Sequence, residues 1–129
     1  MGKKIIKTVR APLPVGPYNQ AVGINNLVYT AGQIAIDPKT NAVCPGGVAD
    51  QTRMVLNNLK AVLEDAGSSL PQIIKATVFL KDMNDFQAMN AVYQEFFESS
   101  TAPARSTIEV ARLPKDVLVE IEAVATTDK

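Results

Sequence analysis

The sequence predicts an α+β two-layer sandwich, in which two helices cover one face of a mixed sheet of about six strands. Two long segments repeat apolar residues at helical spacing, and shorter segments rich in Val, Ile and Thr precede, separate and follow them. The segments between these elements are rich in Pro, Gly and Asn, which are typical of turns. A chain of 129 residues is long enough for one such domain, which we expect to span residues 1–129.

The first three strands are expected at residues 4–9, 18–22 and 27–36, and a loop follows over residues 37–47. Gly32 lies in the middle of the third of these strands. A glycine inside a strand destabilises it unless another group approaches the backbone closely. Either a β-bulge or a bound substrate would explain a glycine at this position.

Two helices are expected, one that starts at Val48 and stops at Gly67, and one that starts with Asp82 as its N-cap. A strand is expected between them at residues 73–80. The second helix has an apolar stripe made of Phe86, Met89, Tyr93, Phe96 and Phe97. Asn90 lies on this stripe, so we expect its amide to be buried and to need hydrogen-bond partners.

The last two strands, at residues 106–110 and 117–125, are expected to form an antiparallel hairpin around a turn. The register that gathers the isoleucines on one face places Arg105 opposite Glu122 and Thr107 opposite Glu120. On spacing alone, a cross-strand salt bridge on a solvated face is the more frequent explanation of this pattern. A substrate site is the alternative, because the apolar Leu118 shares the face with the glutamates.

Charge gives no sign of a polyanionic partner, because 13 basic residues balance 13 acidic residues. We therefore expect neither nucleic acid nor a membrane surface as a binding partner. The sequence has no apolar run long enough to cross a bilayer and no apolar N-terminal signal segment. A cytoplasmic location is expected, and an organellar location stays open.

The residue types that are missing restrict the chemistry further. The chain has no histidine, which excludes the Ser-His-Asp triad, the Cys-His dyad and most zinc sites. The single cysteine, Cys44, excludes an intrachain disulfide and a multi-cysteine zinc site. We expect no metal ion and no organic cofactor, so catalysis must rely on carboxylates, tyrosine, arginine, backbone groups and water.

Several motifs resemble those of the Rid (YjgF/YER/UK) family, and they follow in the same order over nearly the whole chain. They are Val15-Gly16-Pro17-Tyr18, Thr30-Ala31-Gly32-Gln33, Lys75-Ala76-Thr77-Val78-Phe79-Leu80, Pro103-Ala104-Arg105-Ser106 and Val119-Glu120-Ile121-Glu122-Ala123. The resemblance is strongest to the RidA branch, which consists of imine deaminases. It implies a chorismate-mutase-like fold and a homotrimer with active sites between subunits.

The resemblance also implies a reaction, the hydrolysis of 2-iminobutanoate and 2-iminopropanoate to 2-keto acids and ammonia, which protects the cell from reactive imines. Arg105 would bind the substrate carboxylate and Glu120 would hold and deprotonate a water molecule. Tyr18 is implied as a catalytic residue that lines the pocket. Gly32, Asn90, Thr107 and Arg105 are implied as substrate-binding residues. Without the resemblance, Asn90 would be assigned a structural hydrogen bond and Tyr18 a place in the core or at its rim.

Two positions depart from many relatives. Thr107 stands where many have cysteine, so thiol chemistry is excluded there, and Ala102 stands where an aromatic residue is common. Two other functions stay open at this level. Some members of the family are described as endoribonucleases that act on mRNA and inhibit translation, and a non-catalytic holdase that binds small carboxylates is also compatible with the sequence.

Overall fold

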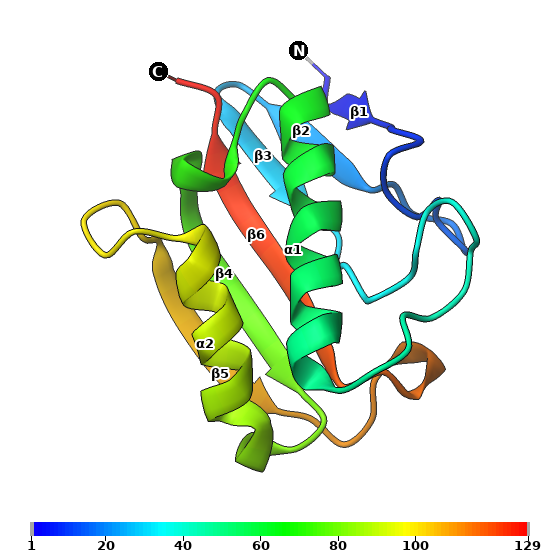
Figure 1. Cartoon of the computed structure of the whole chain (residues 1–129). Helices are drawn as coiled ribbons and strands as arrows, with labels where there is room; N and C mark the ends of the chain where they lie inside the picture. The colour runs from blue at the N-terminus through cyan, green and yellow to red at the C-terminus, as the bar shows by residue number, and fades with distance from the viewer. Residues whose placement is uncertain (1, 129) are drawn as a thin grey trace.

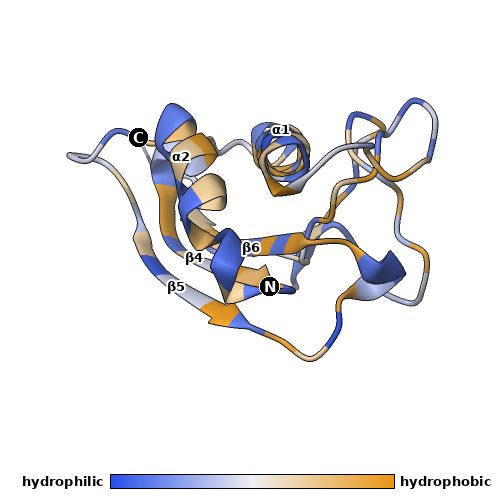
Figure 2. Cartoon of the chain, turned by 60° about the horizontal axis from the view of Figure 1, so that its bottom comes forward, coloured by the Kyte–Doolittle hydropathy of each residue, from blue (hydrophilic) through white to orange (hydrophobic). Residues whose placement is uncertain are grey.

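A single mixed sheet with two helices on one face forms the fold, as the computed structural model, which describes residues 2–128, shows (Figures 1 and 2). The strand order is β1-β2-β3-β6-β4-β5. The strands are β1 (Lys4–Ile6), β2 (Ala21–Ile24), β3 (Leu27–Thr30), β4 (Ile73–Leu80), β5 (Ala104–Glu109) and β6 (Val119–Thr126), and the helices are α1 (Val48–Asp65) and α2 (Phe86–Phe96). Within residues 2–128, none of the helices has the length and hydropathy needed to cross a membrane. The predicted fold class and element order are confirmed.

The helices begin and end close to the predicted residues. Helix α1 starts at Val48 and is followed by Gly67, whose φ of +80° suits a residue without a Cβ. The Asp82 carboxylate accepts a hydrogen bond from the backbone N–H of Asn84, which caps a short 3₁₀ turn, Met83–Asp85. Helix α2 begins directly after this turn, so Asp82 caps the turn and not α2 itself.

The core lies between the helices and the sheet, and strand alternation decides which residues enter it. In β6, Val119 and Ile121 are fully buried toward the helices, whereas Glu120 and Glu122 point to the opposite, open face. This open face also carries partly exposed apolar side chains from other strands, including Ile24, Tyr29 and Ile108. Neither helix covers it (Figure 2).

The predicted hairpin of the last two strands is wrong, because β4 lies between β5 and β6. Strand β5 pairs with β4 in parallel, with Arg105 beside Ala76 and Thr107 beside Val78. Since Ala76 and Val78 are buried beneath the helices, Arg105 shares the helix-covered face.

Strand β6 pairs with β4 in antiparallel fashion, with Glu120 beside Phe79 and Glu122 beside Thr77. The two glutamates therefore lie on the open face, and neither is opposite Arg105 or Thr107. The physical reason is the helix between β4 and β5. A strand–helix–strand connection places its two strands in parallel, and this pairing displaces the hairpin that neighbouring strands would otherwise form.

Candidate functional site

The Arg105 guanidinium is held against helix α2 by three side chains of that helix. Its Nη1 group donates a hydrogen bond of 2.8 Å to the amide oxygen of Asn90. Its Cζ atom lies 4.6 Å from the ring centroid of Tyr93 and 5.6 Å from that of Phe86. Residues 86, 90 and 93 are spaced by four and three positions, so all three project from one stripe of the helix. One planar cation is thus flanked by two aromatic rings and an amide.

The remaining edge of this guanidinium can bind an anion. Within residues 2–128, no carboxylate lies within 4 Å of Arg105, and its Nε and Nη2 groups have no protein hydrogen-bond partner. Two parallel N–H groups suit a carboxylate. The cleft beside Arg105 is lined by Tyr93, Gln94, Phe97, Ser99, Ala102 and Pro103. Glu122, which the predicted register places opposite Arg105, lies on the other face of the sheet.

A second cavity, of about 110 Å³, contains the Glu120 carboxylate. Twelve residues from the N-terminal loop, the segment after β3, the turn before β6 and β6 line it, namely Pro12, Leu13, Val15, Tyr18, Gln20, Gly32, Gln33, Ile34, Ile36, Pro114, Lys115 and Glu120. Burial raises the pKa of Glu120, and the nearby negative charge of Glu122 raises it further. A carboxylate with a raised pKa is a better proton acceptor, so this cavity is suited to general base chemistry.

Gly32 lies against Glu120. Strand β3 ends at Thr30, but the backbone of Gln33 exchanges two hydrogen bonds with Ile121, of 2.8 and 3.1 Å, so the chain continues alongside β6. A Cβ atom at position 32 would overlap the Glu120 side chain. The sequence suggested a β-bulge or a bound substrate at Gly32, whereas the group that approaches its backbone in the structure is the side chain of Glu120.

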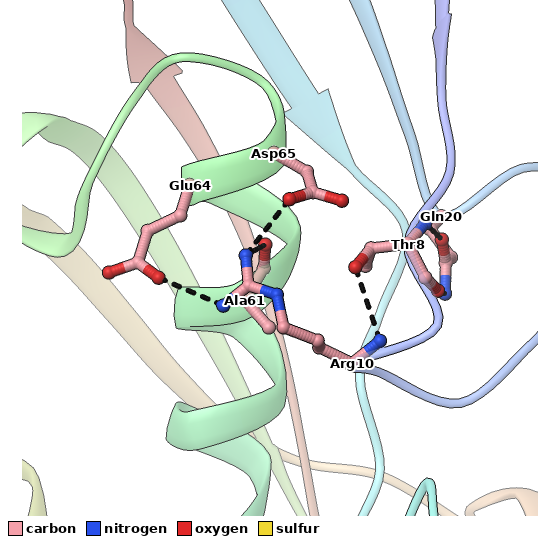
Figure 3. Close-up of polar contacts among 6 residues, drawn as sticks. All are labelled: Thr8, Arg10, Gln20, Ala61, Glu64 and Asp65. Carbon is pink, nitrogen blue, oxygen red and sulfur yellow. Dashed lines mark hydrogen bonds and ion pairs between the residues drawn. The ribbon is translucent and has the colours of Figure 1, made fainter.

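A buried glutamine fixes the loop that carries Tyr18. The Gln20 side chain is 1% exposed, and its amide nitrogen donates to the carbonyls of Thr8, Ala11 and Pro12 at 3.0, 3.3 and 2.8 Å. Its amide oxygen accepts from the N–H of Thr8 at 2.7 Å. This segment is also tied to helix α1, because the Arg10 guanidinium contacts the Glu64 and Asp65 carboxylates at 3.2 and 2.9 Å (Figure 3).

The predicted site residues therefore fall into two separate groups. Tyr18, Gly32 and Glu120 line one cavity, whereas Asn90 and Arg105 meet in another place with Thr107 on the same sheet face. A single chain does not bring the two groups together. Sequence reasoning also missed three residues, Gln20, Phe86 and Tyr93. The sequence shows that Phe86 and Tyr93 share a helix face with Asn90, but it does not show that Arg105 lies on the side of the sheet that this helix covers.

Comparison with known proteins identifies the family. A family model described as endoribonuclease L-PSP matches residues 8–127. The chain is 59% identical over 126 residues to a RutC family protein of Synechocystis sp., covering 97% of each chain. It is 52% identical over 124 residues to the 2-iminobutanoate/2-iminopropanoate deaminase of Escherichia coli, covering 95% of this chain and 96% of that one. The crystal structure of E. coli TdcF with bound serine has a TM-score of 0.91 at 50% identity, covering 97% of this chain and 99% of that one.

These matches extend over nearly the whole chain, and the matched range, residues 8–127, includes Tyr18, Gly32, Arg105 and Glu120. The chain belongs to the endoribonuclease L-PSP family, the YjgF/Rid proteins.

Proposed function

We propose that this protein hydrolyses 2-imino acids, with 2-iminobutanoate and 2-iminopropanoate as representative substrates, to 2-keto acids and ammonia. The observation that carries the proposal is the presence of two complementary half-sites, the Arg105 cleft and the Glu120 cavity. Arg105 offers two parallel N–H groups to a carboxylate, and Glu120 is a half-buried base with a raised pKa. The 52% identity to the E. coli deaminase supports the same substrate class.

The proposed reaction needs no nucleophilic side chain, because the carbon of a protonated imine is already electrophilic. Arg105 binds the carboxylate and thereby fixes the position of that carbon. As a water oxygen bonds to the carbon, Glu120 accepts one proton from the water, and the C=N π electrons become a lone pair on nitrogen. Glu120 then returns this proton to the nitrogen.

The C–N bond of the resulting carbinolamine breaks with both electrons going to nitrogen, so ammonia leaves. The hydroxyl oxygen forms the carbonyl and gives its proton to Glu120, which passes it to ammonia. One iminium ion and one water thus give one 2-keto acid and one ammonium ion.

The separation of the half-sites leads us to propose a homotrimer in which the Arg105 cleft of one subunit faces the Glu120 cavity of the next. Arg105 lies on the helix-covered face and Glu120 on the open face, so one chain cannot apply both to one substrate. The open face carries Tyr29 and Ile108, which are 48% and 44% exposed, and such side chains favour burial by another subunit. Light scattering should then give three times the 13.8-kDa mass of the chain. A stable monomer with full activity would contradict the shared site.

A coupled assay tests the reaction. An amino-acid oxidase generates the imine, semicarbazide traps what remains, and the protein should divert imine to 2-keto acid before it is trapped. Glu120→Gln should lower kcat roughly 100-fold or more, because a positioned proton acceptor is lost. It should leave the binding of 2-oxobutanoate nearly unchanged, whereas Arg105→Ala should abolish that binding. A normal rate in Glu120→Gln would exclude Glu120 as the base.

The family description gives a second candidate, endoribonuclease activity. RNA binding depends on contacts between basic side chains and phosphates, and it weakens steeply with salt. The net charge of zero and the absence of histidine do not favour this reaction. A steep salt dependence of RNA affinity together with RNA cleavage that Arg105→Ala abolishes would favour it over imine hydrolysis.

A further inference from the structure

We infer that Phe86 and Tyr93 are positioning residues which fix the plane and location of the Arg105 guanidinium, and that they select arginine over lysine as the carboxylate-binding cation. The inference rests on the proposed function for the identity of the ligand. The contact itself is a property of the free protein.

The neighbours of Arg105 restrain two different movements of its guanidinium. Asn90 bonds to Nη1 and so fixes the rotation of the guanidinium within its own plane. The rings of Tyr93 and Phe86, with centroids 4.6 and 5.6 Å from Cζ, limit its movement out of that plane. The Nε and Nη2 groups are left for the ligand. A lysine ammonium has no plane and no fork, so neither ring could orient it.

The ring of Tyr93 is itself buried and packed against another ring. It is 6% exposed, and it stacks on Phe97 with the two ring centroids 4.4 Å apart. Its hydroxyl oxygen is buried, and no hydrogen-bond partner for it lies within residues 2–128. The hydroxyl therefore plays no part in holding Arg105, and the aromatic face does. This distinction gives a conservative variant, because Tyr93→Phe keeps the ring and removes only the hydroxyl.

A purely structural role for these rings would make different predictions. If Phe86 and Tyr93 only packed the core, replacing either with leucine would lower stability, and it would change ligand affinity no more than any other core substitution on α2. Phe96 provides the matched control, because it is a partly buried aromatic residue of the same helix that does not contact the Arg105 guanidinium.

The experiment uses the full-length protein with two readouts. The first is the Nε–Hε signal of Arg105 in NMR spectra of the ligand-free protein, assigned by its loss in Arg105→Lys. The second is the affinity for 2-oxobutanoate, measured by calorimetry. Phe86→Leu and Tyr93→Leu should each move the Hε signal downfield, because a ring-current contribution is lost, and each should weaken binding about tenfold. Tyr93→Phe, which keeps the ring, should restore most of the Hε shift and of the affinity that Tyr93→Leu loses. Phe96→Leu should leave both readouts unchanged.

A double-mutant cycle completes the test. Arg105→Lys should weaken 2-oxobutanoate binding strongly in the wild-type background and much less in the Phe86→Leu background, because the rings no longer favour the planar cation. Equal losses in both backgrounds, or an unmoved Hε signal in both leucine variants, would overturn the inference while leaving the proposed function intact. If the wild type binds no 2-oxobutanoate but the Hε signal still responds to the rings, the positioning role stands and the proposed function fails.

Discussion

The Arg105 guanidinium and the Glu120 carboxylate lie on opposite faces of the same sheet, although only strand β4 separates their strands. Arg105 points toward helix α2, where Asn90 binds it. Glu120 points into a cavity on the open face, beside Gly32. The two groups that the proposed reaction needs together are therefore presented in different directions by each chain, and several predictions depend on this arrangement.

Mixed assemblies should recover activity that each parent variant has lost. Arg105→Ala and Glu120→Gln should each be nearly inactive alone. After the two are unfolded together at equal concentrations and refolded, a cyclic trimer should regain roughly a quarter of wild-type activity, because one in four subunit contacts joins an intact Arg105 to an intact Glu120. Activity is measured with the imine-trapping assay. Mixing the folded variants without unfolding is the control, and no recovery after refolding would exclude a site shared between subunits.

Gly32→Ala should impair turnover more than stability. The added methyl group would occupy the space of the Glu120 side chain and displace the carboxylate. A displacement of about 1 Å at a reacting group can cost about 100-fold in rate, so we expect a loss of that order in kcat. Gly23→Ala in β2 is the matched control, because the nearest atom to its new Cβ is the Leu27 carbonyl oxygen at an ordinary 3.6 Å. Turnover of Gly32→Ala at the wild-type rate would show that Glu120 does not act from this position.

The pH profile should report the environment of Glu120. As a base, Glu120 must be ionised, so kcat/KM should fall as the pH drops through its raised pKa. Glu122→Gln removes a negative charge that raises this pKa, so the acid limb of the profile should move to lower pH. Glu98→Gln, an exposed substitution after α2, should leave the limb unchanged. An acid limb that stays in place in Glu122→Gln would mean that another group controls it.

The raised pKa of Glu120 also affects the free energy of unfolding, to which this residue should contribute less at neutral pH than at acidic pH. The pKa of Glu120 is higher in the folded than in the unfolded chain, so the folded state favours the protonated form. Its stabilising contribution is present at acidic pH and is lost as the pH rises through the folded-state pKa. Glu120→Gln should therefore unfold at a higher denaturant concentration than the wild type at neutral pH, with a smaller difference at pH values below that pKa.

Gln20→Glu should destabilise the protein by about 2–4 kcal/mol, because it replaces a donor to three carbonyls with a carboxylate that repels them. It should also raise KM, since Tyr18 and the loop that lines the Glu120 cavity would lose their anchor. Urea unfolding and steady-state kinetics measure the two effects. Gln87→Glu makes the same chemical change at an exposed position of α2 and should alter neither. A stability close to that of the wild type would exclude the proposed role of Gln20.

Thr107→Cys should leave turnover within a few-fold of the wild type. Thr107 lies on the face of Arg105, two positions further along β5, and the proposed reaction uses no thiol. The imine-trapping assay measures the effect, with Thr107→Ser as the control, because serine has the shape of cysteine and keeps the hydroxyl. An increase of orders of magnitude in Thr107→Cys would mean that the threonine marks an altered site.

The sequence predicts what is local and misses what depends on distant pairing. The helical spacing of Val55, Leu59 and Val62 lies within one segment, so helix α1 could be predicted from that segment alone. The partner of β5 could not, because adjacency in sequence favours a hairpin with β6, whereas the helix between β4 and β5 favours a parallel pair. That single error put Arg105 on the wrong face. Residue types at the candidate site were predicted, but their arrangement in space was not.

Strand β6 follows every other strand in the chain, yet it lies in the sheet between β3 and β4. While the polypeptide is being synthesised, β1 to β3 and the β4–α2–β5 unit therefore form two separate parts of the sheet, each with an unpaired strand edge that favours association with other chains. Val119–Thr126 pairs with β3 on one side and with β4 on the other and so completes the sheet. A nonsense codon before this strand would thus yield an aggregation-prone fragment that is degraded, and not a folded domain.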